Sequence, residues 1–174
     1  METMKALLER RSVRGYKPDP VPADVLEDIL KAGTYAATGM GKQSPIILAV
    51  TNRAVRDRLS ALNAESRGME PGNDPFYGAP AVLVVLANKA VGTHVYDGSL
   101  VMGNLMLAAF DKGVGSCWIS RAKETFETEE GKALLRELGI EGEYEGIGNC
   151  VLGYPADGWP EAKPRKEHYV YYVK

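Results

Sequence analysis

Apolar residues recur along the chain in two periods, and together they predict an alternating series of helices and strands. A spacing of three and four residues is typical of helices that bury one face. It predicts an opening helix that ends near residues 10–12, a helix that begins after Asn52, and longer helices over residues 22–37, 96–112 and 129–138. Continuous apolar runs bounded by turn residues predict strands, which we place at residues 46–50, 81–87, 116–119, 147–153 and, in the tail, 169–173.

This order of elements predicts one domain. The sequence contains no internal repeat, low-complexity tract or linker, and 174 residues suit a single hydrophobic core. We therefore expect one domain over residues 1–174, in which only the tail at residues 163–174 is separate from the body.

Composition and charge exclude several classes of protein. Hydrophobic residues make up 45% and charged residues 25% of the chain, which argues against a disordered chain or a disulfide scaffold. The net charge is −2, so neither a nucleic acid nor a membrane surface is expected as a partner. No run approaches the length of about 20 apolar residues that spans a bilayer, and residues 1–16 lack the apolar core of a signal peptide. We expect a cytoplasmic protein.

Residues that often carry metal or nucleophilic chemistry are few. Cys117 and Cys150 lie in predicted strands, which favours buried thiols that act as small hydrophobic residues; a redox-active pair is the alternative. The sequence has two histidines, His94 and His168, and this small number argues against a tetrahedral zinc site and against a Ser-His-acid triad. We expect no metal.

Two groups of cations stand near the two ends of the chain. Arg10, Arg11 and Arg14 flank Ser12, and a Lys-Pro-Arg-Lys run begins at Lys163. Guanidinium groups and a hydroxyl are suited to the oxygens of a phosphate, so two distant segments that meet on one phosphate explain both groups. The alternatives are cations at a helix carboxyl end with solvated lysines in the tail, or a basic recognition patch.

Two glycine-rich segments fail the tests for common nucleotide motifs. Residues 38–43 end in Lys42-Gln43 and precede a strand, whereas a P-loop needs Ser or Thr after the lysine and then a helix. In the segment from Gly113, Trp118 occupies the third glycine position of the dinucleotide fingerprint. The glycines at 39 and 41 still permit the close backbone approach that a planar ligand requires.

Taken in order, these segments resemble the nitroreductase family over nearly the whole chain. The resemblance is carried by residues 10–14, the Ala-Thr-Gly loop at 37–39 with Gln43, and the segments 77–80, 113–119 and 147–155, followed by Lys163 and Arg165. It implies an α+β fold of three layers (α/β/α), with a mixed, largely antiparallel sheet wrapped by helices. It also implies an interlocked homodimer that holds one FMN per subunit between the two chains, with the tail packed on the partner.

The resemblance also implies a set of cofactor-binding residues. Arg10, Ser12, Lys163 and Arg165 correspond to phosphate ligands, and Arg14 to the cation near the flavin N1 and C2 oxygen. The loop at residues 38–43 would contact the partner's flavin, and backbone at residues 120–121 would approach the N5 edge. The full set is Arg10, Arg11, Ser12, Arg14, Thr38, Gly39, Gln43, Ser120, Arg121, Lys163 and Arg165.

The implied activity is a ping-pong reaction in which NADH or NADPH delivers hydride to flavin N5 and a nitroaromatic, a quinone or a similar acceptor is then reduced. The alternatives are a flavin-binding module without turnover and another flavin-driven reduction such as dehalogenation. The sequence departs from the family pattern at two positions that affect the expected contacts with the substrate. Ala37 stands where many members carry proline, and Gly41 where many carry asparagine. The chain is also short for the family and lacks room for a long helical insertion over the flavin, which predicts an open site.

Overall fold

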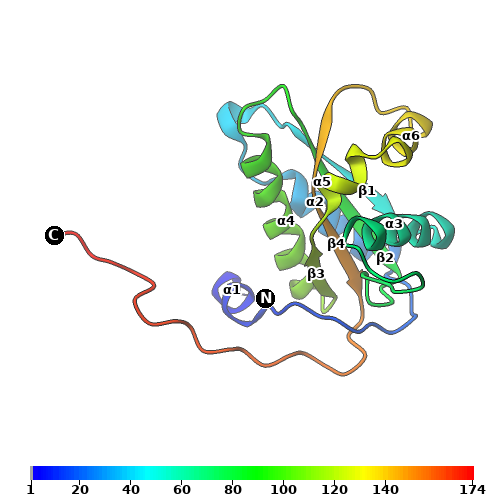
Figure 1. Ribbon diagram of the computed structural model, residues 1–174. Coiled ribbons are helices and arrows are strands. Elements are labelled where there is room, and N and C mark those ends of the chain that lie inside the picture. Colours follow the sequence, from blue (N-terminus) through cyan, green and yellow to red (C-terminus); the bar gives the residue numbers. More distant parts are fainter. Residues whose placement is uncertain (1) are drawn as a thin grey trace.

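The computed structural model describes residues 2–174 and contains a four-stranded sheet in the order β1-β2-β4-β3 (Figure 1). Every neighbouring pair of these strands is antiparallel. The register places Val50 opposite Val82, and Ala81 opposite Leu152. The strands are β1 (Pro45–Val50), β2 (Ala81–Asn88), β3 (Gly115–Ile119) and β4 (Tyr144–Gly153).

Helices fill the intervals between the strands. Two of them begin at side-chain caps that satisfy free backbone amides: Asn52 Oδ1 accepts from Val55 N at 3.1 Å, and Thr128 Oγ1 accepts from Gly131 N at 3.0 Å. The helices are α1 (Thr3–Glu9), α2 (Ala23–Thr34), α3 (Arg53–Ser66), α4 (His94–Asp111), α5 (Ala122–Glu127) and α6 (Glu129–Glu137), with a 3₁₀ turn, η1 (Gly39–Gly41), before β1.

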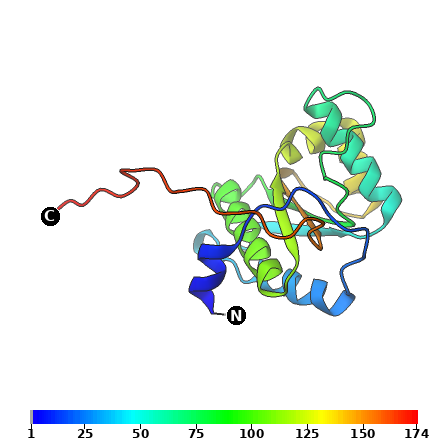
Figure 2. The same cartoon turned by 90° about the horizontal axis from the view of Figure 1, so that it is seen from below.

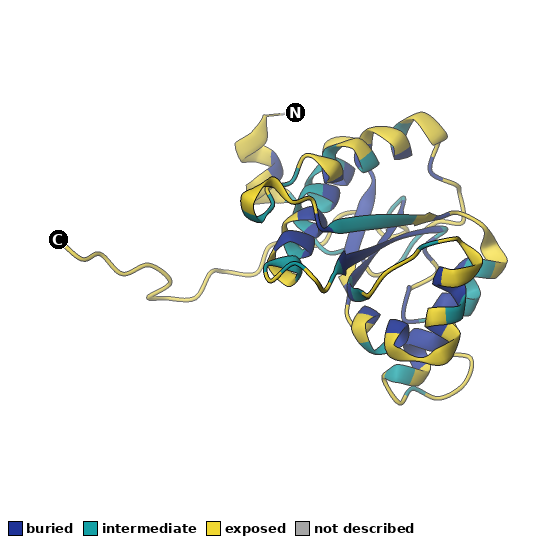
Figure 3. Cartoon of the chain, turned by 90° about the horizontal axis from the view of Figure 1, so that it is seen from above, coloured by how far each residue is buried: buried dark blue, intermediate teal, exposed yellow. Residues whose placement is uncertain are grey.

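The sheet is the middle of three layers. On one face, Ile29 of α2 and Leu105 of α4 pack in a core cluster with Leu83 of the sheet. On the other face, α3, α5 and α6 pack in a second cluster that includes Val82 and Val84. Successive strand residues point to opposite faces, so β2 is buried on both sides, as its continuous apolar run predicts (Figure 3). The predicted α+β fold with a three-layer arrangement is confirmed.

Several predicted boundaries need correction. The helix predicted over 22–37 ends at Thr34, and the helix predicted over 96–112 starts two residues earlier, at His94. Helix α5 was not predicted, because six residues are too few to show a helical period. Strand β4 begins at Tyr144, ahead of the predicted 147, because glycines at 146 and 148 interrupt the apolar pattern of its first half.

The tail forms no strand over residues 156–174, so the strand predicted at 169–173 is wrong for a single chain. After the contacts of Ala156 and Trp159 with the body, the rest of the tail runs away from it as an extended, exposed segment (Figure 1). A strand requires a partner edge for its backbone groups, and residues 169–173 pair with no strand among the described residues. Within residues 2–174, no helix is long and apolar enough to cross a membrane.

Candidate functional site

The segment that follows α1 runs alongside the outer edge of β3. Val13 N donates to Ser116 O at 3.0 Å, and Ser12 forms a parallel bridge with Ser116. Gly115 makes this approach possible, because a Cβ there would lie 2.9 Å from Val13 Cγ2. The segment then turns toward the end of β4, where Tyr16 bridges Pro155. Ser12 and its neighbouring arginines are therefore held at fixed positions beside the sheet.

The start of the tail passes over the same segment. Ala156 N donates to Gly15 O at 3.0 Å, and Trp159 meets Phe110 of α4 edge-on with ring centroids 4.8 Å apart. Figure 2 shows the tail crossing the N-terminal segment in this region. Between them lies an open cavity of about 840 Å³, which we call the cationic cavity; it is lined by Leu7, Leu8, Arg10, Arg11, Ser12, Arg14 and residues 160–165.

The cationic cavity brings together the two groups of cations from the chain ends. Lys163 and Arg165 line it beside Arg10 and Arg14, with Glu161 the one carboxylate among the lining side chains. Arg10 Nη1 is buried and has no hydrogen-bond partner in the described residues. An unpaired buried donor is costly, so this arrangement suits an anion with several oxygens.

Arg11 differs from its neighbours, because its Nη1 donates to Leu8 O and Arg10 O at 2.7 Å each. These carbonyls belong to the end of α1 and the residue that follows it, and cations are favoured at helix carboxyl ends. The helix-end alternative thus describes the Nη1 of Arg11. Its Nε, like Arg10 Nη1, is buried without a hydrogen-bond partner in the described residues, and its side chain also lines the cavity.

The loop at residues 38–44 is organised by Asp97, near the start of α4. Asp97 accepts from Gly39 N at 2.9 Å, from Ser44 Oγ at 2.8 Å and from Thr93 Oγ1 at 3.1 Å. Burial would raise the pKa of this carboxyl, but the three bonds hold it below its ordinary value. Gly39 has no room for a side chain, because a Cβ would lie 2.4 Å from Thr93 Oγ1.

Thr38, Gly39 and Gln43 do not reach the cationic cavity of their own chain. Gly39 is tied to Asp97 near the start of α4, whereas the tail packs on Phe110 near its end. Phe110 lies thirteen positions after Asp97 in α4, which is about 20 Å at 1.5 Å per residue. Figure 1 shows the loop and α1 at opposite ends of α4. The predicted residues of the loop and those of the cationic cavity therefore lie in two separate regions of the chain.

Ser120 and Arg121 form an exposed turn between β3 and α5. Arg121 has φ of 76°, in the left-handed region, and Ser120 O accepts from Asn63 Nδ2 of α3 at 2.8 Å. The turn lies four residues along β3 from Ser116, or about 13 Å at 3.3 Å per residue. A ligand anchored beside Ser12 and extended along β3 would reach it.

The two cysteines lie on opposite faces of the sheet. Cys117 belongs to the cluster with α3, α5 and α6, and Cys150 to the cluster with α2 and α4. Burial raises the pKa of both thiols, and that of Cys150 to about 12. The prediction of buried hydrophobic thiols is confirmed, because both are buried and free.

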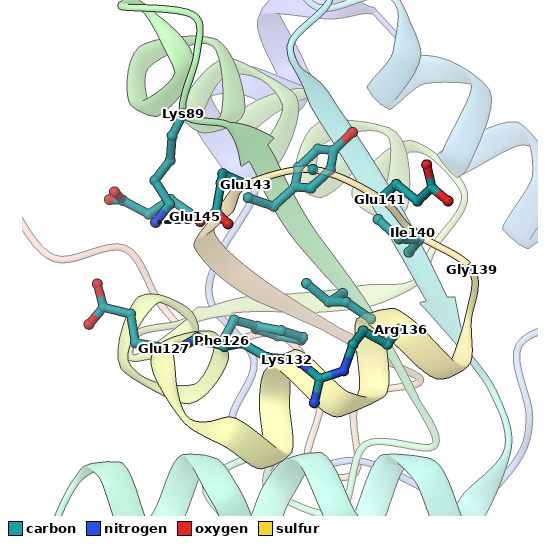
Figure 4. A pocket seen from close by; sticks show the side chains of 13 residues that line it. Lys89, Phe126, Glu127, Lys132, Arg136, Gly139, Ile140, Glu141, Glu143 and Glu145 are labelled. Atoms are coloured by element: carbon teal, nitrogen blue, oxygen red, sulfur yellow. Dashed lines mark ion pairs between the residues drawn. The ribbon is translucent and has the colours of Figure 1, made fainter.

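A second cavity, of about 560 Å³, lies between α6 and the start of β4 (Figure 4). Its charges are mixed, and Lys89 Nζ and Glu143 Oε2 pair across 3.6 Å. It contains none of the predicted cofactor residues. Among the described residues, no group of His, Cys, Asp and Glu is arranged to hold a metal ion.

Comparison with known proteins identifies the family. The sequence model described as "Nitroreductase family" matches residues 7–154. The chain belongs to the nitroreductase family. A curated relative from Archaeoglobus fulgidus, named "Putative NADH dehydrogenase/NAD(P)H nitroreductase", is 30% identical over 162 residues, which cover 90% of this chain and 87% of the relative.

Solved structures of nitroreductases share the fold over the full chain. A nitroreductase with bound FMN from Bacteroides fragilis NCTC 9343 superimposes with a TM-score of 0.88 and 30% identity, and covers all of both chains. A nitroreductase with bound FMN from Desulfitobacterium hafniense DCB-2 has the same TM-score and coverage at 24% identity. As members of one family, these proteins share the arrangement of the sheet and helices described above.

Sequence reasoning missed Asp97 and Asn63, two buried polar residues that hold predicted site segments. Both sit on helices whose apolar pattern identifies the helix but not the partner of a polar residue within it. The one available signal was an Asp in the first turn of the most apolar helix, which favours the positive helix end.

Proposed function

We propose that this nitroreductase-family chain binds FMN and acts as an oxidoreductase that uses NADH or NADPH. The observation that carries the proposal is the cationic cavity, where Arg10, Arg14, Lys163 and Arg165 from the two ends of the chain meet beside Ser12. Bound FMN would accept two electrons as hydride from the nicotinamide and pass them to an acceptor such as a nitroaromatic or a quinone.

The residues of the cavity fit the phosphate end of this cofactor. A phosphate offers oxygens that bind guanidinium, ammonium and hydroxyl donors by charge-assisted bonds, and the buried Arg10 Nη1 is such a donor without a partner. In this role Arg10, Ser12, Lys163 and Arg165 bind the phosphate. Arg14 would place its positive charge beside the flavin N1 edge, where it favours the anionic reduced form.

The proposal includes a homodimer, because the predicted contacts lie in two half-sites about 20 Å apart along α4. Thr38, Gly39 and Gln43 would contact the cofactor of the partner chain. Exposed apolar side chains support the same arrangement: Tyr171 is 80% and Val173 100% exposed in the tail. The outer edge of β1 has no neighbouring strand in the described sheet, so it offers a place for the partner's tail.

The first test is the visible spectrum of the purified protein before and after addition of FMN. Binding of FMN, followed by bleaching with NADH and recovery with an acceptor, supports the full proposal. Binding without bleaching by NADH or NADPH would leave a flavin-binding module without turnover. Failure to bind FMN would reject the proposal.

A double variant, Arg10→Ala with Arg165→Ala, tests the cavity itself. Each charge-assisted bond contributes about 1.5–3 kcal/mol, so we expect FMN affinity to fall at least about 100-fold. The matched control is Arg53→Ala with Lys132→Ala, which removes the same charge from exposed ion pairs on α3 and α6. Wild-type affinity in the Arg10/Arg165 variant would show that the phosphate binds elsewhere.

A further inference from the structure

Asn63 is a fully buried amide on α3, and it makes one bond to the candidate site. Its exposed fraction is 0%, and its Nδ2 donates to Ser120 O at 2.8 Å. Its Oδ1 has no hydrogen-bond partner in the described residues. A buried polar group of this kind is costly compared with an apolar residue of the same shape, so the bond to Ser120 is the interaction that accounts for an amide at this position.

The bond fixes the orientation of the peptide between Ser120 and Arg121. The carbonyl and the amide of a trans peptide point in opposite directions, and the carbonyl is directed inward at Asn63. The Arg121 N–H is therefore directed to the exposed side of the turn. A ligand anchored at Ser12 and extended along β3 would reach this turn.

Two other contacts hold the ends of the same turn. Ile119 pairs with Asn149 at the end of β3, and Thr125 N donates to Arg121 O at 3.0 Å. Neither contact sets the plane of the Ser120–Arg121 peptide. The conformation of the turn is energetically costly, because Arg121 has φ of 76°, which non-glycine residues rarely adopt.

We infer that Asn63 is a positioning residue that orients the Ser120–Arg121 peptide so that the Arg121 N–H faces the N5 edge of the flavin. The inference rests on the proposed FMN function. Asn63 touches neither the cofactor nor the substrate; it acts through the backbone of the turn. The Arg121 side chain is directed elsewhere, because its Nη1 pairs with Glu124 Oε1 at 2.6 Å.

The test is ¹⁵N NMR of the full chain loaded with ¹⁵N-labelled FMN. A hydrogen bond to N5 moves the N5 resonance upfield, so Asn63→Ala should move it downfield while the N1 resonance stays in place. FMN affinity should fall by no more than about 15-fold, because one hydrogen bond of about 0.5–1.5 kcal/mol is lost while the cationic cavity is untouched. The matched control is Asn104→Ala, which removes a comparable bond, from Asn104 Nδ2 to Ala32 O at 3.0 Å, between α4 and α2.

A double variant separates positioning from general packing. Glycine adopts positive φ without strain, so Arg121→Gly should let the turn keep its shape without the amide. Asn63→Ala with Arg121→Gly should therefore return the N5 resonance toward the wild-type position. A packing defect caused by the lost amide would not be repaired in this way.

The outcomes distinguish the inference from the proposed function. If the wild-type protein does not bind FMN, the proposed function fails. If it binds FMN but Asn63→Ala leaves the N5 resonance unchanged, only the positioning role is overturned. If Asn63→Ala does not fold, Asn63→Leu, which keeps the volume without the donor, replaces it. A folding failure of both variants would overturn the inference in favour of a purely structural role.

Discussion

Asp97→Ala tests whether one buried carboxylate holds the loop that would serve the partner's cofactor. The change removes the acceptor of three bonds, from Gly39 N, Ser44 Oγ and Thr93 Oγ1. Each donor left without a partner costs about 1 kcal/mol or more, so the free energy of unfolding should fall by about 3 kcal/mol. For a chain of this size, that loss lowers the Tm by about 6–12 °C.

The assay is thermal unfolding of the FMN-free protein at one fixed concentration, followed by FMN titration. Asp97→Asn keeps the shape and one acceptor oxygen, and its Nδ2 can donate to the hydroxyls of Ser44 and Thr93, so the free energy of unfolding should fall less than in Asp97→Ala. The control is Asp28→Asn, which breaks an exposed pair with Lys112 and should cost less than about 0.5 kcal/mol. FMN affinity should fall in Asp97→Ala and stay unchanged in Asp28→Asn. If the two variants have equal Tm values and FMN affinities, Asp97 does not hold this loop.

Three further predictions concern the flavin, acid stability and the tail. Arg14→Ala should lower the two-electron potential of bound FMN by about 20–60 mV, equivalent to about 1–3 kcal/mol; an unchanged potential in a spectroelectrochemical titration would exclude the N1 role. Burial alone would raise the pKa of Asp74, but bonds from Arg56 and Ser60 outweigh it and lower the pKa to about 2. The contribution of Asp74 to the free energy of unfolding is therefore complete above about pH 4 and should be lost as the pH falls toward 2. In urea unfolding at pH 2–6, the decrease in the free energy of unfolding at low pH should be about 1–2 kcal/mol smaller in Asp74→Asn than in the wild type. Deletion of residues 167–174 should convert the dimer to monomer in analytical ultracentrifugation, and a truncated chain that still dimerises fully would show that the tail is not needed.

The sequence predicted local structure correctly where the residues that decide it are neighbours in one segment. The helix predicted to begin after Asn52 does so, and the Asn52 side chain caps it by accepting from Val55 N. The run at 81–87 predicts a strand, and β2 is buried on both faces throughout that run. In both cases the residues that decide the structure are neighbours in the chain.

Contacts between distant segments could be predicted from the sequence only in part. Arg10 and Lys163 could be placed in one site, because both cations suit a phosphate and the family resemblance assigns both to the same phosphate. Asp97 could not be linked to Gly39, which is 58 residues away, since nothing in a single sequence says where a buried carboxylate finds its donors. The same holds for Asn63 and Ser120, which are 57 residues apart.

In the proposed dimer, the position of Lys163 and Arg165 within the tail would connect FMN binding to dimer formation. Trp159 fixes the tail on Phe110 before these residues, and exposed apolar residues at 169–173 follow them. A partner chain that covers residues 169–173 would fix the tail on its other side and reduce the entropy that Lys163 and Arg165 lose when they bind a phosphate. Binding free energies are reciprocal, so FMN would then strengthen the dimer by the same factor by which the dimer strengthens FMN binding. In this arrangement the tail contributes both to FMN binding and to the stability of the dimer.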